Sequence, residues 1–271
     1  MATGQEATQF DFGFACDPGQ RRRREPNQDA VEVVLPGAGE RWHPPLLLVA
    51  DGLGKYAGGS LASQLVIKIF KQAFKQAPHP TDYLPLMQSC VRAAHQEIRA
   101  QGARDPGLAL MGSTIVAVTL EAGRLYLLNI GDSRAYLLRG RNTLQISQDQ
   151  SWVAAQVRAG VLTEQEARAH PDRSRLTMAI TAKRSEIKCY TAAERLEPDD
   201  ILLLCSDGLW SVVPETLIHA AALELPPQVA ADKLVALANQ SRGPDNISVI
   251  VARRANAPGK MKAIDPEETG A

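Results

Sequence analysis

Two uniformly apolar segments that end in an Asp-Gly pair constrain the fold of this 271-residue chain more than any other feature. The first is Leu46–Gly54, LLLVADGLG, and the second is Ile201–Gly208, ILLLCSDG. Strands without polar alternation have both faces covered, so we expect layers on either side of the sheet. Each strand then carries one aspartate, Asp51 or Asp207, to the end of a sheet, where the following glycine permits a tight turn. An ordinary turn is the alternative interpretation of either pair taken alone.

The rest of the chain groups its strands and helices rather than alternating them. Apolar residues at helical spacing predict two helices, from Ser60 to Phe74 and from Thr81 to about Gln101, which we expect to pack antiparallel on one sheet face. Further strands are expected at Asp11–Ala15, Ala30–Leu35, Ser113–Leu120, Arg124–Ile130, Arg134–Leu138, Thr143–Ile146 and Asn246–Arg253, of which the third to sixth are predicted to form a meander. Two more helices are predicted at Glu215–Ala222 and Pro227–Asn239. This order predicts a single α+β layered domain.

Composition excludes several classes of protein. Lys plus Arg and Asp plus Glu both number 30, so no net field favours nucleic acid or an anionic membrane. We find neither a signal-peptide pattern nor an apolar run near the roughly 18 residues of a membrane span. Four cysteines without paired spacing predict a reducing, cytoplasmic compartment. Residues 1–9 and 255–271 are expected to be disordered tails, which leaves one domain at residues 10–254.

Five aspartates stand at predicted strand ends beside glycine or asparagine: Asp29, Asp51, Asp132, Asp207 and Asp245. If they converge, their charges raise one another's pKa values unless cations neutralise them. The five histidines and four cysteines show no ligand pairing, so the donors are oxygens, which select Mg²⁺ or Mn²⁺. Two such ions can activate a water for in-line attack on phosphorus, and Arg24 could clamp the phosphate. Solvated loop acids and a structural cation site are the alternatives at this point.

Seven motifs occur in an order that matches a known family. They are REPNQD (24–29), VADGLGKYAGG (49–59), MGST (111–114), GDSRAYLL (131–138), HPDRS (170–174), CSDGLW (205–210) and GPDNISVIV (243–251). Together they cover about residues 10 to 254. The sequence thus resembles the metal-dependent Ser/Thr protein phosphatases of the protein phosphatase 2C type, bacterial branch.

The resemblance implies a fold and a metal site. The fold is a four-layer α-β-β-α sandwich with two central antiparallel sheets and a flap at about residues 150–180. Asp51 would bridge two metal ions, Asp207 and Asp245 would complete the first site, and the Gly52 carbonyl would reach the second. Asp132, together with Asp207 and Ser174, corresponds to the third-metal site of bacterial members.

The resemblance also implies roles for residues beside the ions. Arg24 would hold the substrate phosphate, and Asp29 would position the attacking water. Asn246 and Gln28 would be neighbours that support the ligands. Gln28 departs from the family pattern, since many members place a second-metal glutamate there. Leu53 stands where eukaryotic members place a histidine thought to protonate the leaving group, so a metal-bound water is the expected donor here.

We therefore expect a Mn²⁺- or Mg²⁺-dependent protein phosphatase that hydrolyses phosphoserine and phosphothreonine, with two ions and room for a third. Its substrates would be phosphoproteins made by a Ser/Thr kinase, with no nucleic acid partner, no membrane segment and a monomeric state. A catalytically silent phosphoprotein-binding or regulatory module on the same fold is the alternative that Gln28 and Lys55 favour. A two-metal nuclease is disfavoured because no basic face extends beyond Arg21–Arg24.

Overall fold

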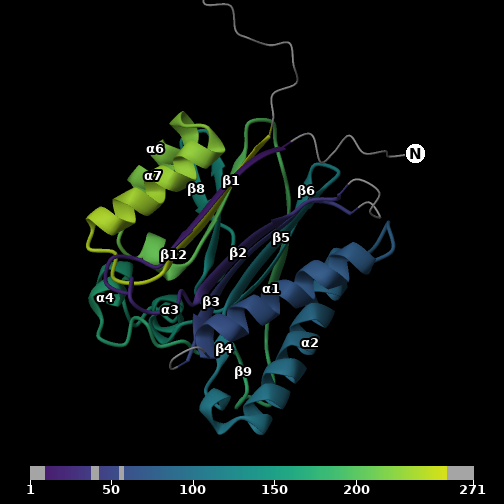
Figure 1. The fold of residues 1–271 in the computed structure, drawn as a ribbon. Coiled ribbons are helices and arrows are strands. Elements are labelled where there is room, and N and C mark those ends of the chain that lie inside the picture. The colour runs from purple at the N-terminus through teal and green to yellow at the C-terminus, as the bar shows by residue number, and fades with distance from the viewer. Residues whose placement is uncertain (1–9, 38–42, 55–57, 255–271) are drawn as a thin grey trace, which may run out of the picture.

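The computed structural model describes residues 10–37, 43–54 and 58–254 (Figure 1). The predicted tails at 1–9 and 255–271 lie outside these described residues. Two antiparallel sheets stack at the centre, and helices cover the outer face of each, as Figure 1 shows. Among the described residues, no helix is long and apolar enough to span a membrane.

The two sheets are built from segments that lie far apart in the sequence. The larger one has the order β10 (Tyr190–Arg195), β6 (Arg124–Ile130), β5 (Ile115–Glu121), β3 (Leu46–Leu53), β4 (Gly112–Ser113), β9 (Ile180–Thr181), with β2 (Asp29–Val34) also paired to β3. The smaller one has the order β1 (Phe10–Asp17), β12 (Ile247–Arg254), β11 (Ile201–Cys205), β7 (Arg134–Arg139), β8 (Asn142–Gln145). The two apolar strands of the sequence, β3 and β11, thus lie in different sheets.

Four longer helices form the outer layers. The helices α1 (Gly58–Gln76) and α2 (Tyr83–Arg104) pack on the larger sheet, and α6 (Glu215–Glu224) and α7 (Pro227–Gln240) on the smaller one. Short helices are η2 (Pro106–Leu108), α3 (Trp152–Arg158), α4 (Glu164–Ala169) and α5 (Asp207–Trp210). The predicted α-β-β-α sandwich is confirmed.

Side-chain alternation along β3 explains its uniform apolar sequence. Leu46, Leu48 and Ala50 face the helices α1 and α2, whereas Leu47 and Val49 enter the layer between the sheets. Because all five are fully buried, each leucine contributes about 1.5–3 kcal/mol through removal from water. The same alternation continues to Asp51, which therefore points toward the end of the inter-sheet layer.

The predicted four-strand meander is wrong. The hairpin of β5 and β6 belongs to the larger sheet, but β7 and β8 belong to the smaller one. The chain crosses between the sheets at Gly131–Ser133, where Gly131 adopts a φ of +99° that favours glycine. The alternation of side chains along a strand shows which residues are buried but not which sheet the strand joins. The sequence pattern therefore does not predict the crossover.

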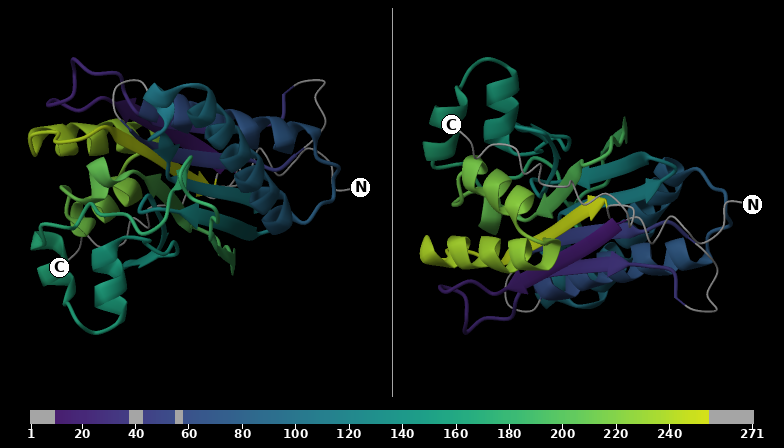
Figure 2. Two further views of the ribbon diagram at one scale, coloured as in Figure 1. Left: turned by 90° about the horizontal axis from the view of Figure 1, so that it is seen from below. Right: turned by 90° about the horizontal axis from the view of Figure 1, so that it is seen from above.

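Other short elements also bear on the sequence predictions. The strand β10 was not predicted, and Asp207 begins the short helix α5 instead of ending a strand. The segment expected to be the flap contains α3 and α4, capped by the hydroxyls of Ser151 and Thr163. In both views of Figure 2, α3 and α4 and the purple loop between β1 and β2 lie at the same end of the molecule.

Candidate active site

The aspartates meet at one end of the inter-sheet layer because of strand register. Asp29 and Asp51 are direct cross-strand partners in the β2–β3 pair. Both share a face with Val31 and Val49, which pack between the sheets. In an antiparallel pair, side chains directly opposite each other have Cβ atoms about 4.5–5.5 Å apart. The apolar layer therefore ends in a pair of neighbouring carboxylates.

Buried hydroxyls join the two sheets at this end. The Ser206 Oγ donates to Asp29 Oδ2 at 2.7 Å and accepts from the Ser248 amide at 3.0 Å. On the other side, Thr114 Oγ1 accepts from the Asp51 amide at 3.0 Å and lies 2.8 Å from Ser133 Oγ. These hydroxyl residues were not predicted as part of the site, although the motifs CSDGLW, MGST, GDSRAYLL and GPDNISVIV contain them.

The carboxylates act on one another electrostatically. Burial, followed by the charges of Asp29, Asp207, Asp132 and Asp245, raises the pKa of Asp51 well above its usual range. Burial and the charges of Asp132, Asp245 and Asp29 raise the pKa of Asp207 in the same way. Burial is also the main cause that raises the pKa of Asp29 to about 6 and that of Asp132 to about 7. All five predicted aspartates are thus brought within electrostatic range.

This excess of negative charge suits a hard divalent cation. The Asp207 Oδ1 is buried without a hydrogen-bond partner, which is a costly state for a carboxylate. In the described part of the chain, however, no three His, Cys, Asp or Glu side chains form a ready cage for one ion. Mg²⁺ commonly binds through one or two carboxylates and keeps several waters, so the oxygen donors present fit it.

Glycine is required directly after Asp51, where the chain continues in β3 as far as Leu53 instead of making the predicted turn. A Cβ on Gly52 would lie 2.1 Å from the carbonyl oxygen of Gly59 and 2.5 Å from that of Gln28. The Gly52 amide also donates to the Gln28 carbonyl at 3.0 Å. The end of β3, the start of α1 and the loop before β2 therefore pack backbone to backbone beside the acids.

Gln28 and Asn246 form hydrogen bonds that connect the backbone segments around the aspartates. The Gln28 amide donates to Asn246 Oδ1 at 2.9 Å, and Asn246 Nδ2 donates to the Pro18 carbonyl at 2.9 Å. The Gln28 side chain donates to the Gly54 carbonyl at 3.3 Å. Both residues therefore connect the β1–β2 loop to the strands that carry the aspartates.

Two predicted site residues are more exposed than the aspartates. Arg24 and Ser174 are both exposed, the first on the β1–β2 loop and the second in the turn after α4. The arginine that contacts an acid is Arg22, whose Nη1 lies 3.1 Å from Asp245 Oδ1. The run Arg21–Arg24 is evident in the sequence, but its spacing does not show which arginine contacts the acids.

A buried cation network links Asp132 to the start of the flap segment. Arg134 donates to both Asp149 oxygens, through Nε to Oδ1 at 3.1 Å and through Nη2 to Oδ2 at 2.7 Å. Its guanidinium carbon lies 3.6 Å from the centre of the Trp210 ring. The Trp210 Nε1 donates to the Asp132 carbonyl at 3.0 Å, and Arg158 of α3 donates to the Asp149 carbonyl at 2.9 Å. This network was not predicted from the sequence, because its members are distant in the chain.

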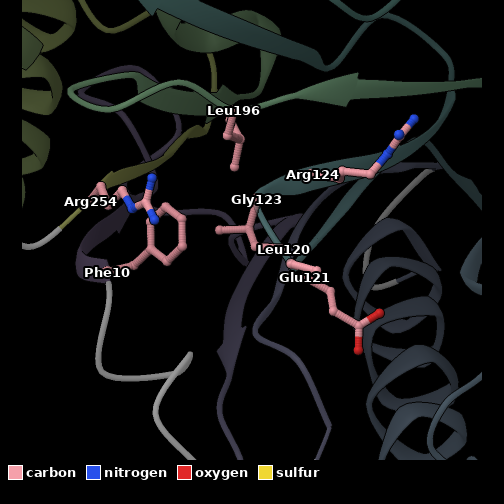
Figure 3. Close-up of a pocket in the computed structure, with 8 residues that line it drawn as sticks. Phe10, Leu120, Glu121, Gly123, Arg124, Leu196 and Arg254 are labelled. Carbon is pink, nitrogen blue, oxygen red and sulfur yellow. The ribbon is translucent and has the colours of Figure 1, made fainter. Parts of the chain in front are cut away.

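The pocket drawn in Figure 3 is not the site that holds the aspartates. The pocket in Figure 3 lies around the β5–β6 turn at the opposite end of the strands, and Leu120, Gly123 and Leu196 line it. It contains Glu121 and none of the five aspartates.

A layered α+β sandwich with buried carboxylates at one end of its paired sheets is the architecture expected of the metal-dependent protein phosphatases. The family model described as protein phosphatase 2C matches residues 17–237, and the chain belongs to this family.

Relatives from several bacteria agree with this assignment. The chain is 39% identical over 232 residues to the serine/threonine protein phosphatase PstP of Mycobacterium tuberculosis, with 84% of this chain and 42% of the relative covered. It thus spans less than half of that relative's length. Identity to the protein phosphatase PhpP of Streptococcus pneumoniae is 30% over 243 residues, covering 89% of this chain and 96% of PhpP.

Solved structures show the same fold. The catalytic domain of PstP, determined in complex with two manganese ions, superposes with a TM-score of 0.79 at 34% identity. The match covers 92% of this chain and 99% of that domain.

Proposed function

We propose that this chain is a protein-serine/threonine phosphatase that depends on Mn²⁺ or Mg²⁺. The observation that carries the proposal is the group of five interacting aspartates, one with a buried unpartnered oxygen, in a chain of the protein phosphatase 2C family. The two manganese ions in the related PstP domain support the choice of cation. Residues 10–254 would form the catalytic domain, with the flap at about 150–180.

The ligands would come from the carboxylates and one carbonyl. Asp51, Asp207, Asp245 and the Gly52 carbonyl would hold two ions, and Asp132 with Ser174 would contribute to a third. When bound, the ions lower the pKa of water and neutralise charge on the phosphate. Asp51 and Asp207 fit this role because the charges of the other aspartates act on both carboxylates.

The remaining site residues bind or orient. Arg24 presents a planar set of donors to the phosphate oxygens from an exposed position on the rim. Asp29 accepts the Ser206 hydrogen bond through Oδ2, which fixes its carboxylate for orienting the attacking water. Gln28 and Asn246 hold the loop that carries Arg24 against β12 through their 2.9 Å hydrogen bond.

We further infer the cellular context. Phosphoproteins made by a Ser/Thr kinase would be the substrates, as the names of the relatives suggest, and the chain would act in the cytoplasm as a monomer. Nucleic acid is not an expected partner because Lys plus Arg and Asp plus Glu both number 30.

Replacing Asp207 by asparagine tests the proposal. We expect the parent chain to release phosphate from a phosphothreonine peptide in Mn²⁺ and to lose this activity in a chelator. The Asp207→Asn variant should be inactive with an unchanged circular dichroism spectrum, whereas the exposed Asp11→Asn control should be fully active. Full activity of Asp207→Asn would reject the assignment.

A silent phosphoprotein-binding module is the second candidate, because Gln28 supplies a neutral amide beside the acids. It predicts that the parent chain binds the phosphopeptide without hydrolysing it at any Mn²⁺ concentration. Hydrolysis of p-nitrophenyl phosphate with and without chelator decides between the two.

A further inference from the structure

The loop between β1 and β2 carries a run of four arginines that the proposed chemistry uses only in part. Arg21, Arg23 and Arg24 are exposed, and Arg22 is half-buried against Asp245. A fifth arginine, the exposed Arg242, lies on the loop between α7 and β12. Because the whole chain has a formal net charge of zero, this concentration of cations is a local property.

Hydrogen bonds hold the loop beside the acidic site. The Arg21 amide donates to the Gly243 carbonyl at 3.1 Å, which places Arg21 next to Arg242 in space. The Pro18 carbonyl accepts from Asn246 at 2.9 Å, and the Glu25 amide closes the turn on the Arg22 carbonyl at 2.8 Å. These hydrogen bonds involve the backbone of the loop and not its arginine side chains.

Few acids compensate these cations. Within the described residues, Asp245 pairs with Arg22, and no carboxylate forms an ion pair with Arg21, Arg23 or Arg24. Glu25 is the one acid inside the loop sequence from Gln20 to Glu25. Exposed guanidinium groups on one short loop attract the anionic groups of a partner.

The loop and the flap helices α3 and α4 lie at the same end of the molecule (Figure 2), and the contact of Arg22 with Asp245 places the loop beside the aspartates. A phosphorylated residue reaching the acids must bring its neighbours across this rim. Acidic neighbours would meet Arg21, Arg23 and Arg242, whereas Arg24 would remain for the phosphate and Arg22 for Asp245.

We propose that Arg21, Arg23 and Arg242 form a docking surface for phosphopeptides that carry Asp or Glu beside the phosphorylated residue. This inference rests on the proposed function and names its substrate class. The interaction is electrostatic and exposed, so it acts on selection among substrates and weakens with salt. A solvated arginine loop without a partner would show no preference among peptides.

The test compares two phosphothreonine peptides that differ only in flanking residues, glutamate in one and glutamine in the other. For the parent chain at low salt, kcat/KM should be about two- to tenfold higher for the acidic peptide, as expected for a few exposed charge pairs. In the Arg21→Gln/Arg23→Gln variant the ratio should fall toward one. The backbone hydrogen bond of Arg21 survives this change, and thermal unfolding checks that the variant is folded.

A matched control uses two exposed arginines at the other end of the molecule. Arg124 and Arg195 are cross-strand partners in the β6–β10 pair, and Figure 3 shows Arg124 beside the distant pocket. The Arg124→Gln/Arg195→Gln variant removes the same charge and should keep the parent's ratio. A ratio near one in the parent, or an equal fall in both variants, would overturn the docking surface.

A binding measurement separates this inference from the proposed function. Fluorescence anisotropy with the same two peptides and Mn²⁺ needs no turnover. If no peptide is hydrolysed but the acidic one binds more tightly and loses this advantage in Arg21→Gln/Arg23→Gln, the phosphatase assignment fails and the docking surface holds. If both peptides are hydrolysed at equal rates, the phosphatase assignment holds and the docking surface fails.

Discussion

Replacing Asp132 by asparagine should stabilise the metal-free chain, and increasingly so as pH rises. The Asp132 side chain is 5% exposed, and burial followed by the charge of Asp149 raises its pKa from 3.8 to about 7. The folded state therefore binds a proton between about pH 4 and pH 7 that the unfolded state has released. Stability is lost as pH rises through this window. The neutral asparagine avoids that loss.

The size of the effect follows from the shift. Roughly three pKa units at about 1.4 kcal/mol each set an upper limit of about 4 kcal/mol above pH 7. We expect Asp132→Asn to gain about 2–4 kcal/mol at pH 8, which corresponds to about 4–12 °C in Tm for a domain of this size. At pH 5 the gain should be at most about 1.5 kcal/mol.

Thermal unfolding by circular dichroism in a chelator at pH 5 to 8 measures this difference. The exposed Asp11→Asn variant serves as the control and should follow the parent at every pH. Adding Mn²⁺ should remove the advantage of Asp132→Asn, because bound cations neutralise the acids of the parent. A difference that stays constant or shrinks from pH 5 to pH 8 would refute the reasoning.

Three further substitutions test the residues that surround the aspartates. Arg134→Ala leaves the Asp149 carboxylate, 9% exposed, without its partner and should cost about 3–5 kcal/mol in urea unfolding; a loss below about 1 kcal/mol would contradict the network. Gly52→Ala forces a Cβ to 2.1 Å from the Gly59 carbonyl and should lower both Tm and phosphatase activity, so a stable, active variant would disprove this packing. Gln28→Glu adds a carboxylate beside the acids and should lower the Mn²⁺ concentration for half-maximal activity; an unchanged titration curve would place Gln28 away from the ions.

Local sequence patterns were sufficient for most of the elements. The strand expected in the apolar segment Leu46–Gly54 is β3, Leu46–Leu53, and the helix predicted from Thr81 to about Gln101 is α2, Tyr83–Arg104. These patterns are reliable because alternation and helical periodicity are set by neighbours a few residues apart. The confirmed α+β sandwich follows from how the elements are grouped along the chain.

Partners from distant segments could not be predicted in this way. Which sheet β7 joins, and therefore where Asp132 lies, depends on the crossover at Gly131–Ser133. Likewise, the contact of Arg22 with Asp245 requires the loop before β2 to meet the loop before β12. Local periodicity predicts neither the sheet that β7 joins nor the contact of Arg22 with Asp245.

The sequence by itself determined the buried strands, the helices and the aspartates that follow or begin strands, since each depends on short-range patterns of polarity. Only the tertiary structure decided that Asp29 and Asp51 face each other across β2 and β3, that Ser206 and Thr114 join the two sheets beneath them, and that Arg22 is the arginine at Asp245. The physical reason is that register, sheet membership and loop contact are set by packing between residues that lie far apart in the chain, such as Arg22 and Asp245.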